Sequence, residues 1–125
     1  MSQDIVADGL NQIMNANRVE KKKVVIKRYS KVLIGLLEMM REKGHIDYKV
    51  YDKKRLLEVE IKKLNFCKAV KPRYFVKVKD INKYLRRFLP SRNFGTLVIS
   101  TNLGLLDHQE AYEKNSGGSI IAYFY

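Results

Sequence analysis

Segments with two different periods of apolar residues alternate along this chain, and each segment is short. In residues 3–16, Val6, Leu10 and Ile13 recur at helical spacing. In residues 46–50 and 57–61, every second residue is apolar, which is typical of a strand with one buried face. A chain that changes repeatedly between these two periods is predicted to have an α+β fold.

The first half of the chain is predicted to be helix, strand, helix, strand, strand. The expected elements are a helix at 3–16, a strand at 24–26, a helix that begins after Ser30 and ends at Gly44, and a hairpin of strands at 46–50 and 57–61. The polar residues 52–55 supply the turn of that hairpin.

The second half is predicted to be strand, helix, strand, helix, strand. The expected elements are a strand at 74–78, a helix capped by Asp80 and ended by Pro90, a strand at 94–99, a polar loop at 100–104, a helix from Asp107 to about Asn115, and a strand at 120–125. We therefore expect an N-terminal αβαββ module (residues 1–64) and a C-terminal βαβαβ module (residues 65–125), packed against each other.

Positive charge is concentrated in two segments. The chain has 25 Lys and Arg against 13 Asp and Glu, a formal charge of +12. Residues 18–31 hold 7 basic side chains and one acid (+6), and residues 68–92 hold 9 and one acid (+8), so the remainder nets −2. A solvated cationic face would explain a charge run, but such segregation is more typical of a surface that follows phosphates.

Composition excludes several classes of protein. An apolar content of 46% with 10% aromatics and only 2 Pro is not that of a disordered basic tail. Apolar stretches are interrupted by charges such as Glu38, so no membrane association is expected. One cysteine, Cys67, excludes a disulfide framework and fits a reducing compartment. Residues 1–10 contain acids but no basic residue, unlike a signal or transit peptide, so we expect a cytosolic or nuclear protein.

Catalytic patterns are weak. His108 and Glu110 have the His-x-Glu spacing of zinc deaminases, but the Pro-Cys-x-x-Cys motif of those enzymes is absent. Cys67 is better explained as a small buried hydrophobe than as a nucleophile. The Gly117-Gly118 pair lacks the lysine of a phosphate-binding loop. We expect no enzyme, no cofactor, no metal site and no small-molecule substrate.

A nucleic-acid partner is the leading hypothesis. Basic side chains anchor phosphates, and the small polar residues of the 100–104 segment could contact sugars and base edges, unless that segment is an ordinary connection. The aromatic residues among the second group of cations either stack on bases or belong to the core: Tyr74, Phe75, Tyr84 and Phe88. A DNA-binding or chromatin protein and a module that docks an acidic protein are the rival interpretations.

Several motifs of this sequence resemble those of a known family. They are LPSRNFG at 89–95, STNLG at 100–104, DHQEA at 107–111 and GGSIIAYFY at 117–125. Weaker similarity extends through DGLNQIMNA at 8–16, SKVLI at 30–34 and GHI at 44–46. In this order and spacing the motifs resemble protein eight of the small ribosomal subunit, in its archaeal and eukaryotic cytosolic branch.

The resemblance implies a two-domain α+β protein that binds an irregular stem in the central domain of small-subunit rRNA, on a cytosolic ribosome, beside neighbouring ribosomal proteins. It places the principal rRNA contact in a C-terminal loop that corresponds to Thr101, Asn102, Leu103 and Gly104, preceded by Ser100. Most members have Ser where this chain has Asn102, and a charged residue is frequent where it has Ser119.

Together, the residues and the resemblance give a set of expected RNA contacts. Sugars and base edges are expected at Ser100, Thr101, Asn102 and Gly104. Phosphates are expected at Lys21, Lys22, Lys23, Arg28 and Lys31 in the first module, and at Lys71, Arg73, Arg86, Arg87 and Arg92 in the second.

Overall fold

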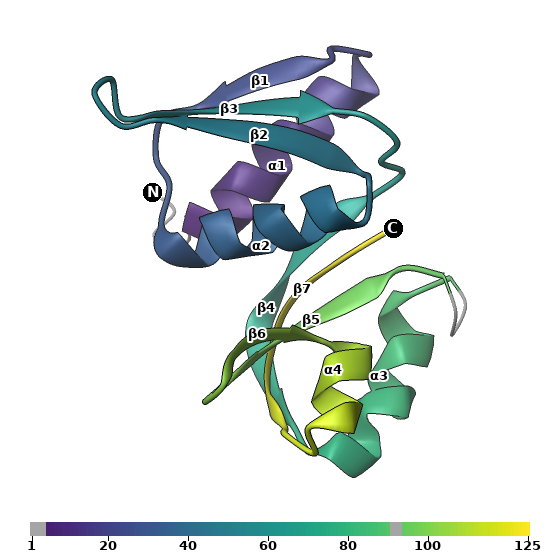
Figure 1. The fold of residues 1–125 in the computed structure, drawn as a ribbon. Helices are drawn as coiled ribbons and strands as arrows, with labels where there is room; N and C mark the ends of the chain where they lie inside the picture. The colour runs from purple at the N-terminus through teal and green to yellow at the C-terminus, as the bar shows by residue number, and fades with distance from the viewer. Residues whose placement is uncertain (1–4, 91–93) are drawn as a thin grey trace. The chain divides into compact units, whose positions relative to one another are not determined.

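A computed structural model describes residues 5–90 and 94–125, with the exception of the side chains of residues 71 and 72. The chain divides into two compact units, residues 1–67 and residues 68–125. Each unit has its own β-sheet, covered by its own helices (Figure 1). The expected α+β class with two modules is confirmed. No helix among the described residues has both the length and the apolar character needed to cross a bilayer.

The first unit has the predicted order of elements. These are α1 (Ile5–Arg18), β1 (Lys23–Ile26), α2 (Lys31–Glu42), β2 (Ile46–Tyr51) and β3 (Leu56–Ile61). The strands form an antiparallel sheet in the order β1-β3-β2. Both helices lie on one face of this sheet (Figure 1).

The strand register decides which residues of the first sheet are buried. Val59 of β3 pairs with Val24 and with Tyr48, and Leu57 pairs with Ile26, so these side chains share the face covered by the helices. Charged residues occupy the alternate positions, where Glu60 pairs with Lys23. On the helix side the apolar stripe of α2 is fully buried: Leu33, Leu36, Leu37 and Met40.

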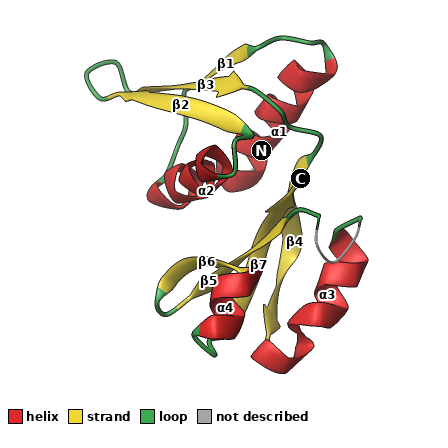
Figure 2. Ribbon diagram, turned by 45° about the vertical axis from the view of Figure 1, so that its right-hand side comes forward, coloured by secondary structure: helices red, strands yellow, loops and turns green. Residues whose placement is uncertain are grey.

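The second unit is built on a four-stranded sheet in the order β4-β7-β5-β6. Its elements are β4 (Cys67–Val76), the 3₁₀-helix η1 (Val78–Asp80), α3 (Ile81–Phe88), β5 (Thr96–Thr101), β6 (Gly104–Asp107), α4 (His108–Glu113) and β7 (Gly118–Phe124). Ile81 and Leu85 of α3 and Ala111 of α4 join Leu97 and Ile120 of the sheet in one core, so both helices cover the same face (Figure 2).

Strand β6 is the element that the sequence pattern did not predict. We expected a loop at 100–104, but Ser100 and Thr101 complete β5, and Gly104 opens β6. Thr101 pairs with Gly104, so the turn proper is only Asn102 and Leu103. A strand of four residues is too short to show an alternating pattern, which is why its two leucines were not recognised as a strand.

The three predicted helix starts after Ser30, Asp80 and Asp107 are confirmed, but only two of these residues make a side-chain capping bond. The Leu33 N–H donates to Ser30 Oγ at 3.2 Å, and the Glu110 N–H donates to Asp107 Oδ1 at 2.7 Å. Asp80 makes no side-chain capping bond; η1 runs directly into α3, and the Ile81 N–H donates to the carbonyl of Val78. The 3₁₀ turn thus satisfies the first N–H of α3, which is not one of the N–H groups that an N-cap side chain reaches.

Because Ser30 makes a capping bond and Asp80 does not, we expect their replacement by alanine to have unequal effects on the free energy of unfolding. Ser30→Ala should lower the free energy of unfolding by about 1 kcal/mol, because it removes the acceptor for the Leu33 N–H. Asp80→Ala should change it by less than about 0.5 kcal/mol. Urea denaturation followed by circular dichroism measures both values. Equal losses would show that Asp80 caps α3 after all.

Candidate nucleic-acid interface

The turn between β5 and β6 is a hairpin held by one side chain. The Thr101 hydroxyl donates to the carbonyl of Gly104 at 2.9 Å and accepts from the Leu103 N–H at 3.0 Å. Asn102 and Leu103 project from this frame and are exposed, Leu103 with 59% of its surface. The hairpin therefore presents a short polar and apolar tip in a fixed conformation.

Asn102 connects the hairpin to the segment between α4 and β7. Its Oδ1 accepts a hydrogen bond from Ser116 Oγ at 3.5 Å. Within the described residues, the two N–H donors of the Asn102 amide have no partner, so they are available to an outside acceptor. A serine at this position would offer one donor rather than two.

Gly117 and Gly118 fix the position of the hairpin, which sequence reasoning did not predict. A Cβ built on Gly118 would lie 2.1 Å from the carbonyl oxygen of Ser100, and one on Gly117 would lie 2.5 Å from that of Val76. Strand β7 therefore begins in close contact with the ends of β4 and β5. A glycine pair immediately before an apolar run was the available signal for this close approach.

Gly104 is needed for a different reason. Its φ is +108°, a backbone conformation that residues with side chains rarely adopt. Among the described residues, none beyond its chain neighbours has an atom within 4 Å of a Cβ built there. A side chain at this position would therefore strain the backbone, but it would not clash with neighbouring atoms of the described residues.

The expected phosphate contacts of the first unit are all exposed. Lys21 and Lys22 lie between α1 and β1, Lys23 lies in β1, Arg28 follows β1, and Lys31 opens α2. One of them is paired, because Lys23 Nζ lies 3.8 Å from Glu58 Oε1. Arg28 borders a hollow of about 510 Å³ that is also lined by Lys27 and Arg55, with Asp52 as the acid there.

In the second unit, Arg73, Arg86 and Arg87 are exposed, Arg73 on β4 and the other two in the last turn of α3. The Arg87 guanidinium lies over the ring of Tyr74, 5.4 Å from its centroid. Lys71 belongs to β4, but its side chain lies outside the description, and Arg92 lies outside the described residues.

The aromatic residues near these cations divide into two kinds. Tyr74, Tyr84 and Phe88 pack against the core of the second unit, with ring centroids 6.1 Å apart for Tyr74 and Tyr84 and 6.4 Å apart for Tyr84 and Phe88. For these three, the interpretation as core residues is confirmed. Phe75 is different, because 72% of its surface is exposed.

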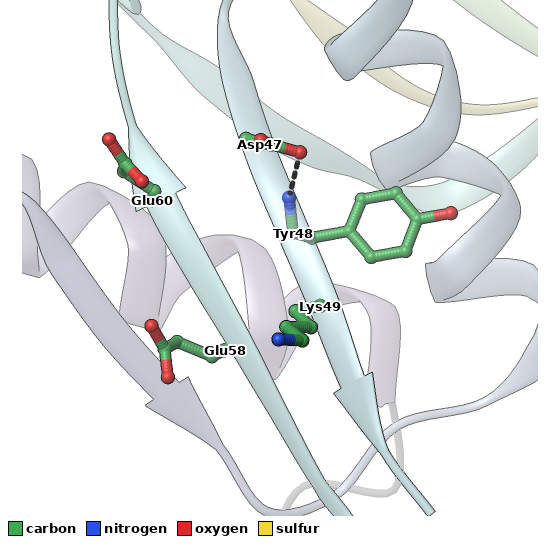
Figure 3. A pocket seen from close by; sticks show the side chains of 5 residues that line it. All are labelled: Asp47, Tyr48, Lys49, Glu58 and Glu60. Atoms are coloured by element: carbon green, nitrogen blue, oxygen red, sulfur yellow. Dashed lines mark hydrogen bonds between the residues drawn. The ribbon is translucent and has the colours of Figure 1, made fainter.

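Acidic residues gather on the uncovered side of the first sheet. Asp47, Glu58 and Glu60 line a hollow of about 180 Å³ together with Lys49 (Figure 3). The Asp47 carboxylate accepts from the backbone N–H of Tyr48 at 2.8 Å. Lys23, paired with Glu58, adds a second ammonium beside the three carboxylates, so the hollow keeps a net negative charge and repels phosphate. Among the expected phosphate contacts of the first unit, Lys23 is therefore the one that lies beside these carboxylates.

The groups considered for catalysis are structural. Burial raises the pKa of the Cys67 thiol to about 12, and only 3% of the residue is exposed. His108 is buried, and its Nδ1 accepts from the Leu97 N–H at 3.3 Å.

A polar contact in the first unit has a structural role as well. The hydroxyl of Tyr48 donates to Glu38 Oε2 at 2.7 Å, and this hydrogen bond, together with Arg41, lowers the pKa of Glu38. These two residues join β2 to α2.

Comparison with known proteins gives a consistent result. Residues 4–125 match the model of the family Ribosomal protein S8. The chain is 39% identical over 127 residues to small ribosomal subunit protein uS8A of Schizosaccharomyces pombe, with 98% of both chains covered. It is 40% identical to uS8my of Arabidopsis thaliana and 39% identical to uS8 of Nanoarchaeum equitans, each over 129 residues and the whole of both chains. Because the match extends over nearly every residue of both units, the chain belongs to the ribosomal protein S8 family.

Proposed function

We propose that this protein is a constituent of the small ribosomal subunit that binds an irregular stem in the central domain of small-subunit rRNA and supports subunit assembly and translation. The observation that carries this proposal is the exposed hairpin at residues 101–104, held by its own hydrogen bonds on a chain of charge +12. Family membership confirms the expectation that the protein is not an enzyme.

The two kinds of contact have separate tasks in this proposal. Lysine and arginine side chains on both units neutralise phosphates and supply affinity for any RNA. The hairpin supplies preference for one RNA, because its exposed groups meet sugars and base edges in the wide, shallow minor groove of RNA.

Hydrogen-bond accounting assigns roles within the hairpin. The proton of the Thr101 hydroxyl is already donated to Gly104, so toward RNA this hydroxyl acts as an acceptor, suited to a ribose 2′-hydroxyl. The Asn102 amide offers two donors, suited to the acceptors that line the minor groove. Ser100 and the exposed backbone at Gly104 complete the proposed contact.

The partners proposed on this basis are small-subunit rRNA and neighbouring small-subunit ribosomal proteins. The proposed location is the small subunit of a cytosolic ribosome. The names of the three relatives described above support the small subunit, since each is called a small ribosomal subunit protein. The cytosolic compartment is proposed from the resemblance of the sequence motifs.

Competition binding tests the proposal. Filter binding should show that the central-domain stem of small-subunit rRNA competes at least about a hundredfold better than a shuffled RNA of equal length and base composition. A DNA duplex of the same sequence should compete no better than the shuffled RNA, because it lacks the 2′-hydroxyls. Equal competition by all three nucleic acids would overturn the proposal and favour a general polyanion binder.

Substitution of a phosphate contact is expected to act on all RNAs alike. Lys22→Ala or Arg86→Ala should weaken binding to the cognate stem and to the shuffled RNA by the same factor. Each should also reduce the slope of log K against log[salt] by about one. Filter binding across a salt series measures both effects. Lys54→Ala, an exposed lysine in the β2–β3 turn, is the control and should leave the slope unchanged. A loss confined to the cognate stem would contradict the assignment of Lys22 and Arg86 to phosphates.

A further inference from the structure

Phe75 is the most exposed large apolar residue among those described in the second unit, at 72%. It lies in β4, at one edge of the sheet. Val76 and Tyr74, its neighbours in sequence, belong to the core or pack against it. Because side chains alternate along a strand, Phe75 lies on the opposite face of β4 from that core.

Two cations flank Phe75 on the same side of the strand. Arg73 and Lys77 are two residues away in either direction, and both are exposed. Lys77 retains an extended backbone (φ −84°, ψ 155°), so the alternation continues through it. The result is a row of cation, phenyl ring and cation along an exposed strand edge.

The ring of Phe75 takes part in none of the ring pairs formed among the described residues, whereas Tyr74, Tyr84, Phe88 and Tyr123 form a continuous row of such pairs. An exposed phenyl ring contributes nothing to the core and leaves apolar surface in water. Its face is therefore available to a planar partner.

The glycine pair places this row beside the recognition hairpin. Gly117 contacts the end of β4 at Val76 and Lys77, and Gly118 contacts the end of β5 at Ser100 and Thr101. Only β7 separates β4 from β5, so the two strand ends lie about 10 Å apart at neighbouring strand spacings. One RNA segment of a few nucleotides can span that distance.

We propose that Arg73, Phe75 and Lys77 form a stacking platform for an unpaired base of the same RNA that the hairpin contacts. The face of the base lies on the phenyl ring, and the phosphates on either side of that nucleotide meet Arg73 and Lys77. This inference rests on the proposed function and adds the kind of RNA feature that is recognised: a single unstacked nucleotide beside the minor groove that the hairpin contacts.

Binding to paired and bulged RNAs tests the platform directly. The first pair of probes is a duplex RNA with one unpaired adenosine and the same duplex without it. The second comparison is between the intact central-domain rRNA stem and a series of variants of that stem, in each of which one unpaired nucleotide is made abasic. Phe75→Ala should weaken binding to the bulged duplex and to the intact stem by about tenfold. The same substitution should not change binding to the fully paired duplex, which has no unpaired base. It should also not change binding to the one abasic stem that already lacks the base stacked on Phe75.

Matched variants separate stacking from other effects. Phe75→Trp and Phe75→Tyr keep a flat ring and should retain binding within about threefold of the original protein. Tyr51→Ala removes an exposed ring from β2 in the other unit and should leave every affinity unchanged. In addition, the original protein should quench the fluorescence of 2-aminopurine placed at the unpaired position, whereas the Phe75→Ala variant should not.

The outcomes distinguish this inference from the proposed function. Equal weakening of all RNAs by Phe75→Ala, or failure of tryptophan to preserve binding, would overturn the platform even if the rRNA stem is preferred. If the original protein shows no preference for the rRNA stem, the proposed function fails, yet a selective loss on the bulged duplex still supports the platform.

Discussion

Replacing Gly118 with alanine is expected to destabilise the second unit and to displace the recognition hairpin. The new Cβ would lie 2.1 Å from the Ser100 carbonyl oxygen and 3.1 Å from the Thr101 Cα, and both are backbone atoms that no side-chain rotation can move aside. The start of β7 would have to separate from β5, where Ser119 pairs with Ser100. We expect a loss of about 3 kcal/mol in the free energy of unfolding, measured by urea denaturation.

Gly44→Ala is the matched control for this substitution. Gly44 follows the C-cap of α2 with φ +82°, and in the described part of the chain only its sequence neighbours come within 4 Å of a Cβ built there. Its replacement should cost only the backbone strain, about 1 kcal/mol. If Gly118→Ala were no more costly than Gly44→Ala, the close contact between β7 and the end of β5 would not exist in solution.

Replacing Gly104 with valine is expected to abolish most of the preference for the cognate stem while weak binding to all RNAs persists. A β-branched side chain is strained at φ +108°, so the hairpin must change its backbone conformation and lose the Thr101 to Gly104 hydrogen bond. The proposed phosphate contacts lie on other elements and should remain. We expect the ratio of cognate to shuffled affinity to fall by at least about tenfold in filter binding.

The control for strain alone is Gly44→Val, at a glycine of positive φ in the first unit. That variant should lose similar stability but keep its preference for the cognate stem. If Gly104→Val weakened binding to cognate and shuffled RNA equally, the separation between anchoring cations and a recognising hairpin would be wrong.

Most of the fold could be predicted because its signals are local. Ser30 and Asp107 cap helices through side chains that reach only three residues ahead, so their sequence context was sufficient. Strand β6 was missed because its existence depends on pairing with β5, at contacts such as Ile99 with Leu106. Asp80 occupies the predicted N-cap position of α3 but makes no side-chain capping bond, and the 3₁₀ turn before it was not predicted from the sequence pattern.

The candidate interface was predictable to a smaller extent. Charge segregation and the 100–104 motif indicated which segments to consider, since both can be read along the chain. The internal use of the Thr101 hydroxyl and the contact of Gly118 with Ser100 join residues that only the folded sheet brings together. Tyr74 and Phe75 are adjacent in sequence and alike in chemistry. Only the folded sheet shows that Tyr74 lies on the face of β4 that packs against the core, while Phe75 lies on the opposite face and is exposed.

Crosslinking from the tip of the hairpin tests the central claim most directly. A benzophenone amino acid at position 103, where Leu103 is 59% exposed, would be irradiated with total cellular RNA and the adducts sequenced. The same group at Lys54, in the β2–β3 turn, serves as the reference. The account predicts that adducts from position 103 concentrate on one irregular stem in the central domain of small-subunit rRNA. Adducts spread over all RNAs, in the same pattern as those from position 54, would contradict it.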